Sequence, residues 1–123
     1  MGILDGKRIL VRCDFNVPLD DGRIVDDLRI RSALPTLHWL TERGAVVTAM
    51  SHLGRPNGKV IESARLRPVA QRLSQLLRQS VPCTGDALGL GTEDAIGRLK
   101  PGQALLLENL RFQDRRLVAF WVL

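Results

Sequence analysis

Polar side chains that can bind anions or hydroxyl groups close or follow three of the four short apolar segments that the sequence predicts as strands. They are Asp14 and Asn16 for the first segment, His52 and Arg55 for the second, and Glu108, Asn109 and Arg111 for the last. In an open parallel sheet, the ligand crevice lies beyond the carboxyl ends of the strands. We therefore expect these side chains to converge on one site.

The residue types in this set indicate the kind of ligand. Arginine presents a planar fork that binds a carboxylate or phosphate through two hydrogen bonds, whereas an Asp with an Asn suits the hydroxyl groups of a small polar molecule. Arg29, at the start of the first predicted helix, adds a further guanidinium to the same crevice. The sequence therefore predicts a pocket for a hydroxylated, doubly anionic molecule.

Some of these residues also have a purely structural interpretation. Asp14 and Asn16 could simply turn the chain before Pro18, and His52 could be an ordinary buried histidine that backbone groups satisfy. Both interpretations stay open at the level of sequence.

The arginines have structural alternatives as well. Arg29 and Arg111 could be solvated, or paired with the carboxylates of Asp26, Asp27 or Glu108. A second group of arginines falls on the polar side of the second predicted helix, and we interpret it as a solvated face: Arg65, Arg67, Arg72 and Arg78.

Short apolar runs and helical spacing alternate along the chain. Strands are expected over residues 9–17, 45–50 and 104–107, with a weak, short strand over 81–84. A turn at residues 20–22 follows the first strand. Each long connection has room for a right-handed crossover.

Helices are expected between these strands. The first has its apolar positions from Ile30 onward, with Asp26 or Asp27 as its cap, Gly44 at its end and Pro35 either kinking it or starting it. The second covers residues 66–77 with a proline in its first turn. A short third helix opens at residue 92 and ends by 100–102. The fold class predicted is α/β, an open, doubly wound and mainly parallel sheet covered on both faces.

Composition excludes several classes of protein. The 123 residues allow one domain, and the formal charge of +5 favours anionic partners. We rank nucleic acid well below a small anion, because the chain has no Tyr, aromatics make up 4% and the arginines are scattered. Cys13 and Cys83 form no metal-binding pattern and fit a reduced, cytoplasmic compartment. No export signal, membrane anchor or metal site is predicted.

Two glycine-containing stretches fail as nucleotide motifs. Residues 54–59 have the wrong spacing for a phosphate-binding loop, and Val60 stands where that loop uses Ser or Thr for magnesium. Residues 85–91 lack the third glycine of a dinucleotide fingerprint. No nucleotide site is predicted in this chain.

Four motifs in order closely resemble phosphoglycerate kinase. They are residues 11–18 (VRCDFNVP), 27–36 (DLRIRSALPT), 50–56 (MSHLGRP) and 106–112 (LLENLRF). The resemblance runs from about Leu4 to Phe112 and covers the front of that family's N-terminal domain. It implies a partial N-terminal domain over residues 1–112, with a non-matching tail over 113–123.

The resemblance implies reversible phosphoryl transfer between 1,3-bisphosphoglycerate with MgADP and 3-phosphoglycerate with MgATP, a step of glycolysis. The family has two Rossmann-like lobes, of which the N-terminal one holds the glycerate and the other the nucleotide. By motif matching, Arg29 would be catalytic, and the substrate-binding residues would be Asp14, Asn16, Arg29, His52, Arg55 and Arg111.

The resemblance also sets expectations for the chain as a whole. It would carry part of the glycerate-binding half only, so we expect no kinase activity from it alone. The alternatives are a non-catalytic module that binds 3-phosphoglycerate, or an unstable truncated product. We further expect a cytoplasmic monomer that binds neither nucleic acid nor membrane, with Mg-ATP or Mg-ADP as a co-substrate held outside this chain.

Overall fold

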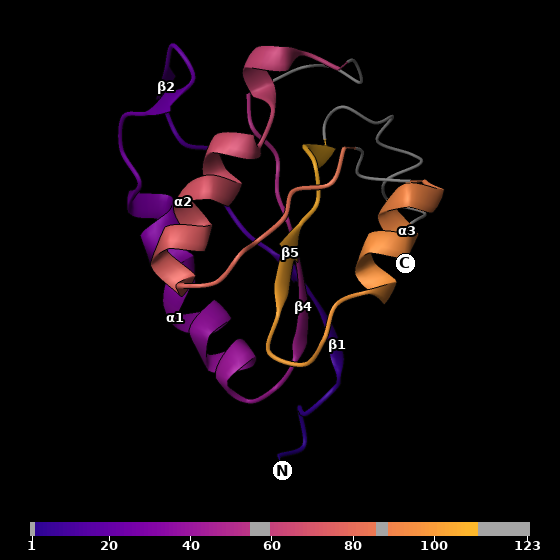
Figure 1. Ribbon diagram of the computed structural model, residues 1–123. Coiled ribbons are helices and arrows are strands. Elements are labelled where there is room, and N and C mark those ends of the chain that lie inside the picture. The colour runs from indigo at the N-terminus through magenta and orange to yellow at the C-terminus, as the bar shows by residue number, and fades with distance from the viewer. Residues whose placement is uncertain (1, 55–59, 86–88, 111–123) are drawn as a thin grey trace.

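Three short parallel strands form the centre of the fold in the computed structural model, which describes residues 2–54, 60–85 and 89–110 (Figure 1). The strands β1 (Arg8–Arg12), β4 (Val46–Met50) and β5 (Ala104–Leu106) lie in the order β1-β4-β5. The predicted weak strand extends this sheet: Thr84 N donates to Leu106 O at 3.1 Å, and Leu106 N donates to Pro82 O at 2.9 Å. β5 therefore lies between β4 and residues 82–84.

Helices cover both faces of the sheet. Figure 1 shows α1 (Leu28–Glu42) and α2 (Arg67–Leu77) on one side of the strands and α3 (Leu90–Gly97) on the other. A short 3-10 turn, η1 (Glu62–Ala64), precedes α2. The chain runs from residues 82–84 through α3 to β5, which lies nearer to β4, so this crossover runs in the opposite direction across the sheet. A right-handed crossover in the opposite direction places its helix on the opposite face. The doubly wound α/β prediction is confirmed.

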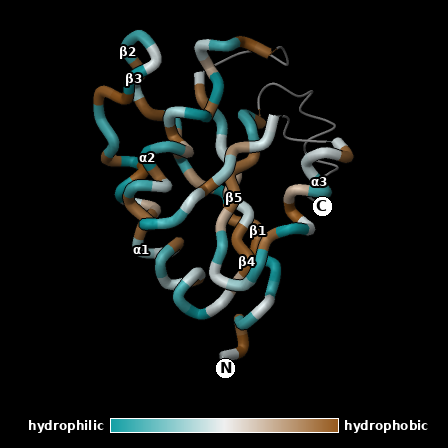
Figure 2. The backbone as a smooth tube through the Cα atoms, in the orientation of Figure 1, coloured by the Kyte–Doolittle hydropathy of each residue, from teal (hydrophilic) through white to brown (hydrophobic). Residues whose placement is uncertain are grey.

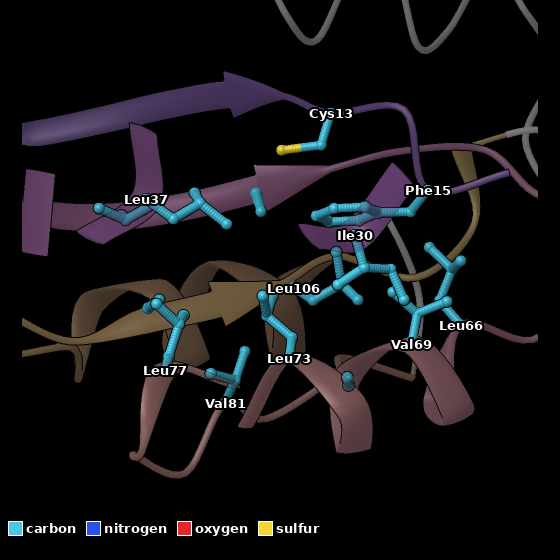
Figure 3. Packing of buried hydrophobic residues seen from close by; sticks show 14 of the residues in the cluster. Cys13, Phe15, Ile30, Leu37, Leu66, Val69, Leu73, Leu77, Val81 and Leu106 are labelled. Atoms are coloured by element: carbon cyan, nitrogen blue, oxygen red, sulfur yellow. The ribbon is translucent and has the colours of Figure 1, made fainter. Parts of the chain in front are cut away.

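Two apolar clusters hold these layers together. The larger lies between the sheet and the helix pair α1 and α2, where Phe15, Leu37, Leu73 and Leu106 are fully buried (Figure 3). The smaller lies under α3 and contains Met50, Leu105, Leu107 and Leu110, packed by Ala95, Ile96 and Leu99. Successive β5 residues enter opposite clusters, as the two-residue repeat of a strand requires. Accordingly, hydrophobic segments of the backbone lie at the centre of the molecule, around the strands, in Figure 2.

The first strand is shorter than the predicted 9–17. Cys13 N still donates to Met50 O at 2.8 Å, but Phe15 N turns away from the ladder to Ser51 Oγ at 2.9 Å. β1 also departs from the expectation of apolar residues on both faces. Ile9 and Val11 pack on the larger cluster, whereas Arg8, Leu10 and Arg12 are exposed.

The start of α1 confirms the predicted cap at Asp26 or Asp27, whereas α2 starts one residue later than predicted and α3 two residues earlier. α1 begins at Leu28, whose N–H donates to Asp26 Oδ1 at 2.9 Å, and it continues through Pro35. The carboxylate of Asp27 makes no capping bond and pairs with arginines instead. α3 begins at Leu90, so Thr92 lies buried inside the helix and not at its cap.

The predicted turn at residues 20–22 joins a small antiparallel hairpin. β2 (Leu19–Asp20) pairs with β3 (Arg23–Ile24) through Asp21 and Gly22, whose φ values are +50° and +75°. Positive φ at both loop positions is typical of a type I′ hairpin turn. The hairpin lies between the end of β1 and the start of α1.

We predict that Leu106→Ala lowers the free energy of unfolding by about 2–5 kcal/mol, because it removes a fully buried side chain from the larger cluster. Leu90→Ala is the control, since this side chain is 85% exposed and its truncation should cost less than about 0.5 kcal/mol. Urea unfolding followed by circular dichroism measures both. Equal effects would contradict the placement of β5 in the core.

We predict that both thiols react slowly with iodoacetamide in the native chain at pH 8. Burial raises the pKa of Cys13 from 9.0 to about 11 and that of Cys83 to about 12, so thiolate is scarce in the folded state. Alkylation should be about a hundredfold slower or more than in urea, since each pKa unit removes about tenfold of the thiolate. Because the folded state keeps these protons longer, stability should fall as pH rises above 9.0 toward those values. Equal native and urea rates would contradict this burial.

Candidate functional site at the carboxyl ends of the strands

A tight turn after β1 presents Asp14 and Asn16 while it buries the residue between them. Asn16 N donates to Asp14 Oδ1 at 3.2 Å, and Val17 N donates to Phe15 O at 2.8 Å. Phe15 is fully buried, and the Asp14 side chain is 65% exposed. The interpretation that Asp14 turns the chain before Pro18 is therefore correct, because its carboxylate accepts a hydrogen bond within the turn. The same carboxylate also faces solvent.

Arg29 reaches this turn from the first turn of α1. Its Nη1 donates to Asn16 O at 2.6 Å and lies 3.5 Å from Asp14 Oδ1. Both side chains are more than half exposed, so the ion pair itself contributes little to stability. Together with the bond to Asn16 O, the ion pair fixes the direction of the Arg29 guanidinium. Of the carboxylates weighed from the sequence, Asp27 pairs with Arg31 and Arg72 instead.

The loop after β4 is joined to the same turn. Gly54 N donates to Asn16 Oδ1 at 3.0 Å, and Phe15 N donates to Ser51 Oγ at 2.9 Å. His52, half-buried, lies within this loop between the two bonds. The structure therefore brings together three of the predicted residues, Asp14, Asn16 and Arg29, and places the loop that carries His52 beside their turn.

Two hollows open beside Asn16. One, of about 420 Å³, is lined by Asn16, Val17, Pro18, Asp26, Leu28 and Arg29. The other, of about 300 Å³, lies on the side of Leu53 and Gly54. Both volumes fit the lower range of small-molecule pockets. The first has a guanidinium and a side-chain amide in its wall, which are the donors that an anion with a hydroxyl group requires.

Glu108 and Asn109 follow β5, but neither residue lines the two hollows beside Asn16. Glu108 Oε1 accepts from Leu66 N at 2.8 Å and from Asn109 N at 2.9 Å, and its Oε2 accepts from Arg65 Nη1 at 3.3 Å. Both residues are almost fully buried. The expectation that every polar residue at a strand end faces the crevice is therefore wrong for these two, because they bind main-chain groups of neighbouring loops.

The second group of arginines is likewise not a simple solvated face. Arg65 bridges Glu62 and Glu108, and the hydrogen bonds that it donates to Glu62 raise the pKa of this guanidinium. Arg72 Nε donates to Asp27 Oδ2 at 2.9 Å and so ties α2 to the start of α1. Arg78 ends α2 in the left-handed conformation, with φ at +57°. The four arginines therefore do not form one face of α2, because Arg65 precedes the helix and Arg78 ends it.

Arg55 and Arg111, the remaining predicted site residues, lie outside the described residues, as do residues 113–123. Their roles stay predictions. Leu53 and Gly54 lead directly to Arg55 in the sequence, and Asn109 and Leu110 lead to Arg111.

Two buried polar residues organise this region in a way that the sequence did not predict. Ser51 is 1% exposed and links the loop after β4 to the turn after β1. Asn109 is fully buried, and its Nδ2 donates to Leu53 O at 2.7 Å and to Ala64 O at 2.8 Å. Asn109 was expected to face the ligand and Ser51 carried no expected role, yet a polar residue close behind an all-apolar strand can also satisfy buried backbone groups.

A third hollow, of about 520 Å³, lies between the start of α2 and residues 83–85. Its wall contains Arg65 and Arg67 together with the carboxylates of Glu62 and Glu108. In the described part of the chain, no three His, Cys, Asp or Glu side chains gather to hold a metal ion. Within the same residues, no helix has the length and apolar character needed to cross a membrane.

Comparisons with known proteins agree on one family. The sequence pattern of the family described as phosphoglycerate kinase matches residues 3–116. The phosphoglycerate kinase of Synechococcus elongatus is 58% identical over 110 residues, and that of Moorella thermoacetica is 57% identical over 109. Each alignment covers 89% of this chain, and the chain spans 27% and 28% of the length of those relatives.

Solved structures of phosphoglycerate kinases have the same fold over this stretch. The structure from Coxiella burnetii superposes with a TM-score of 0.78 at 42% identity, covering 90% of this chain and 27% of that one. The structure from Pyrococcus horikoshii superposes with a TM-score of 0.82 at 37% identity, covering 89% and 27%. The family match, the relatives and the shared α/β fold agree over nearly all of the sequence, and the chain belongs to the phosphoglycerate kinase family.

Proposed function

We propose that this chain forms part of the glycerate-binding half of a phosphoglycerate kinase and binds 3-phosphoglycerate and 1,3-bisphosphoglycerate. The observation that carries the proposal is the meeting of Arg29, Asp14 and Asn16 at the end of β1, with Gly54 of the next loop bonded to Asn16. This places a guanidinium, a carboxylate and an amide on one turn. Such a set matches the carboxylate and hydroxyl groups of a glycerate.

Each residue of the site has a role that follows from the chemistry of its side chain. Asp14 accepts a hydrogen bond from a ligand hydroxyl, and the Asn16 amide donates to its carboxylate end. Arg29 lies where a guanidinium reduces repulsion between two anions and stabilises charge on a moving phosphoryl group, so we assign it the catalytic role. His52, Arg55 and Arg111 complete the substrate-binding set, holding the phosphate and neighbouring groups of the glycerate.

The nucleotide co-substrate of the reaction, MgADP or MgATP, does not fit the residues described. In the hollow beside Gly85, Arg65 is already paired with the carboxylates of Glu62 and Glu108, so its guanidinium is engaged and not directed at nucleotide phosphates. We therefore propose that the nucleotide is held by a part of a phosphoglycerate kinase that this chain does not include, and we assign this chain no step on the nucleotide itself.

The chain spans 27% of the length of the Synechococcus relative, so the complete reaction belongs to the whole enzyme. For the 123-residue chain, we propose a partial domain over residues 1–112 that binds substrate as a monomer in the cytoplasm, without turnover of its own. Binding without chemistry is the expected behaviour, because closure over both substrates excludes water and assembles the site.

We predict that 3-phosphoglycerate shifts the amide NMR signals of residues 14–16, 29 and 52–54 in the purified chain. Arg29→Ala should weaken binding by about 10–100-fold, because a hydrogen bond to a charged group contributes about 1.5–3 kcal/mol. Arg31→Ala is the matched control. It lies two positions along the same helix, and its partner is Asp27.

The outcomes separate the alternatives. Dispersed signals that shift in the wild type and in Arg31→Ala, but not in Arg29→Ala, support the proposed site. Equal binding by both variants would contradict the role of Arg29. Collapsed signals would indicate an unstable product, and turnover in a coupled assay with MgATP would contradict the assignment of the nucleotide to another part.

A further inference from the structure

Asn109 follows β5 after Leu107 and Glu108 and is fully buried, although its side chain is among the more polar ones in proteins. Its two Nδ2 hydrogens go to two main-chain carbonyls, Leu53 O at 2.7 Å and Ala64 O at 2.8 Å. These acceptors lie 56 and 45 residues away in sequence. One amide group thus joins three chain segments: the end of β5, the loop after β4, and η1.

The loop that receives this bond is held from its other side as well. Gly54 N, next to Leu53, donates to Asn16 Oδ1 at 3.0 Å, and Leu110 N, next to Asn109, donates to Ser51 O at 3.0 Å. The backbone of residues 51–54 is therefore fixed between the turn after β1 and the end of β5. His52 lies inside this stretch.

We infer that Asn109 is a positioning residue for the glycerate site. It acts through the Leu53 carbonyl, holding the loop of residues 51–54 against the turn that carries Asp14 and Asn16. The inference rests on the proposed function and deepens it, because it names the side chain that keeps residues 51–54 in place beside the turn with Asp14 and Asn16. In sequence, the same bond joins positions two residues before Arg55 and two before Arg111.

An amide is required at this position by the chemistry of its partners. Both partners are carbonyl oxygens, so the side chain must offer two donors, and a buried acceptor left without a donor is costly. A carboxylate of the same shape would place a further acceptor against them. Asn109→Asp therefore removes the tie with almost no change in volume.

Gln79 provides the matched control. Its Nε2 donates to Gly102 O at 2.9 Å and its Oε1 accepts from Ala104 N at 3.2 Å, so it is a partly buried side-chain amide that also ties a main-chain segment to β5. It lies at the amino end of β5, and the proposed site lies beyond the carboxyl end. Gln79→Glu makes the same chemical change far from the site.

The experiment measures amide hydrogen exchange and 3-phosphoglycerate affinity in the wild type, Asn109→Asp and Gln79→Glu. Exchange at Gly54 N–H reports the loop, and exchange at Val46 N–H, bonded to Lys7 O at 2.8 Å, reports the sheet. In Asn109→Asp, we expect Gly54 exchange to rise at least about tenfold relative to Val46, with Kd raised by at least about tenfold. In Gln79→Glu, both the exchange ratio and Kd should stay at wild-type values.

Each contrary result has a distinct meaning. Exchange that rises equally at both positions, or a faster loop with unchanged Kd, would show a merely structural role and overturn the inference. A wild type that shows no shifts with 3-phosphoglycerate would overturn the proposed function and the inference with it. If Asn109→Asp does not fold, Asn109→Ser keeps one donor and should give smaller changes of the same sign. Wild-type side-chain amide protons of Asn109 that exchange freely would also overturn the inference.

Discussion

The parallel ladder of β1, β4 and β5 ends inside the protein, and the main-chain groups beyond its last bond still need partners. A buried N–H or C=O without a partner costs as much as a lost hydrogen bond. Side chains supply what the ladder no longer can: Ser51 Oγ accepts from Phe15 N, Glu108 accepts from Leu66 N, and Asn109 donates to two carbonyls. The shape of the candidate site depends on these bonds, because they decide where each loop leaves the sheet.

Polar residues at the strand ends therefore fall into two kinds. Ser51, Glu108 and Asn109 are buried and bind backbone groups, whereas Asp14 and Arg29 are exposed and paired with each other, and Arg29 lines the hollow beside Asn16. Asn16 belongs to both kinds, because its Oδ1 accepts from Gly54 N while the residue also lines the hollow. A rigid inner set that supports an exposed outer set is the arrangement that precise ligand placement requires.

The fold was largely readable from the sequence. Apolar segments bounded by turn residues gave the strands, and helical spacing gave α1, α2 and α3, because burial dominates these choices. The exact ends of the strands and helices were less predictable. Strand β1 stops where Phe15 N finds Ser51 Oγ, a partner 36 residues away that no local pattern reveals. For the site, motif resemblance and residue chemistry correctly grouped Asp14, Asn16 and Arg29, but Glu108 and Asn109 were misjudged, since exposure depends on tertiary packing.

The position of β5 has a consequence for how the chain acquires its structure. β5 lies between β4 and residues 82–84, yet it is the last of these segments in the sequence. A chain growing from its amino end must keep β4 and residues 82–84 apart, with the apolar flank of β4 open, until residue 104 arrives. Contacts of such long sequence separation form slowly, because the loop between them must close first. Among the described segments of this sheet, the inner strand β5 is thus synthesised last, and the interval before its arrival is when the nascent chain is most exposed to aggregation.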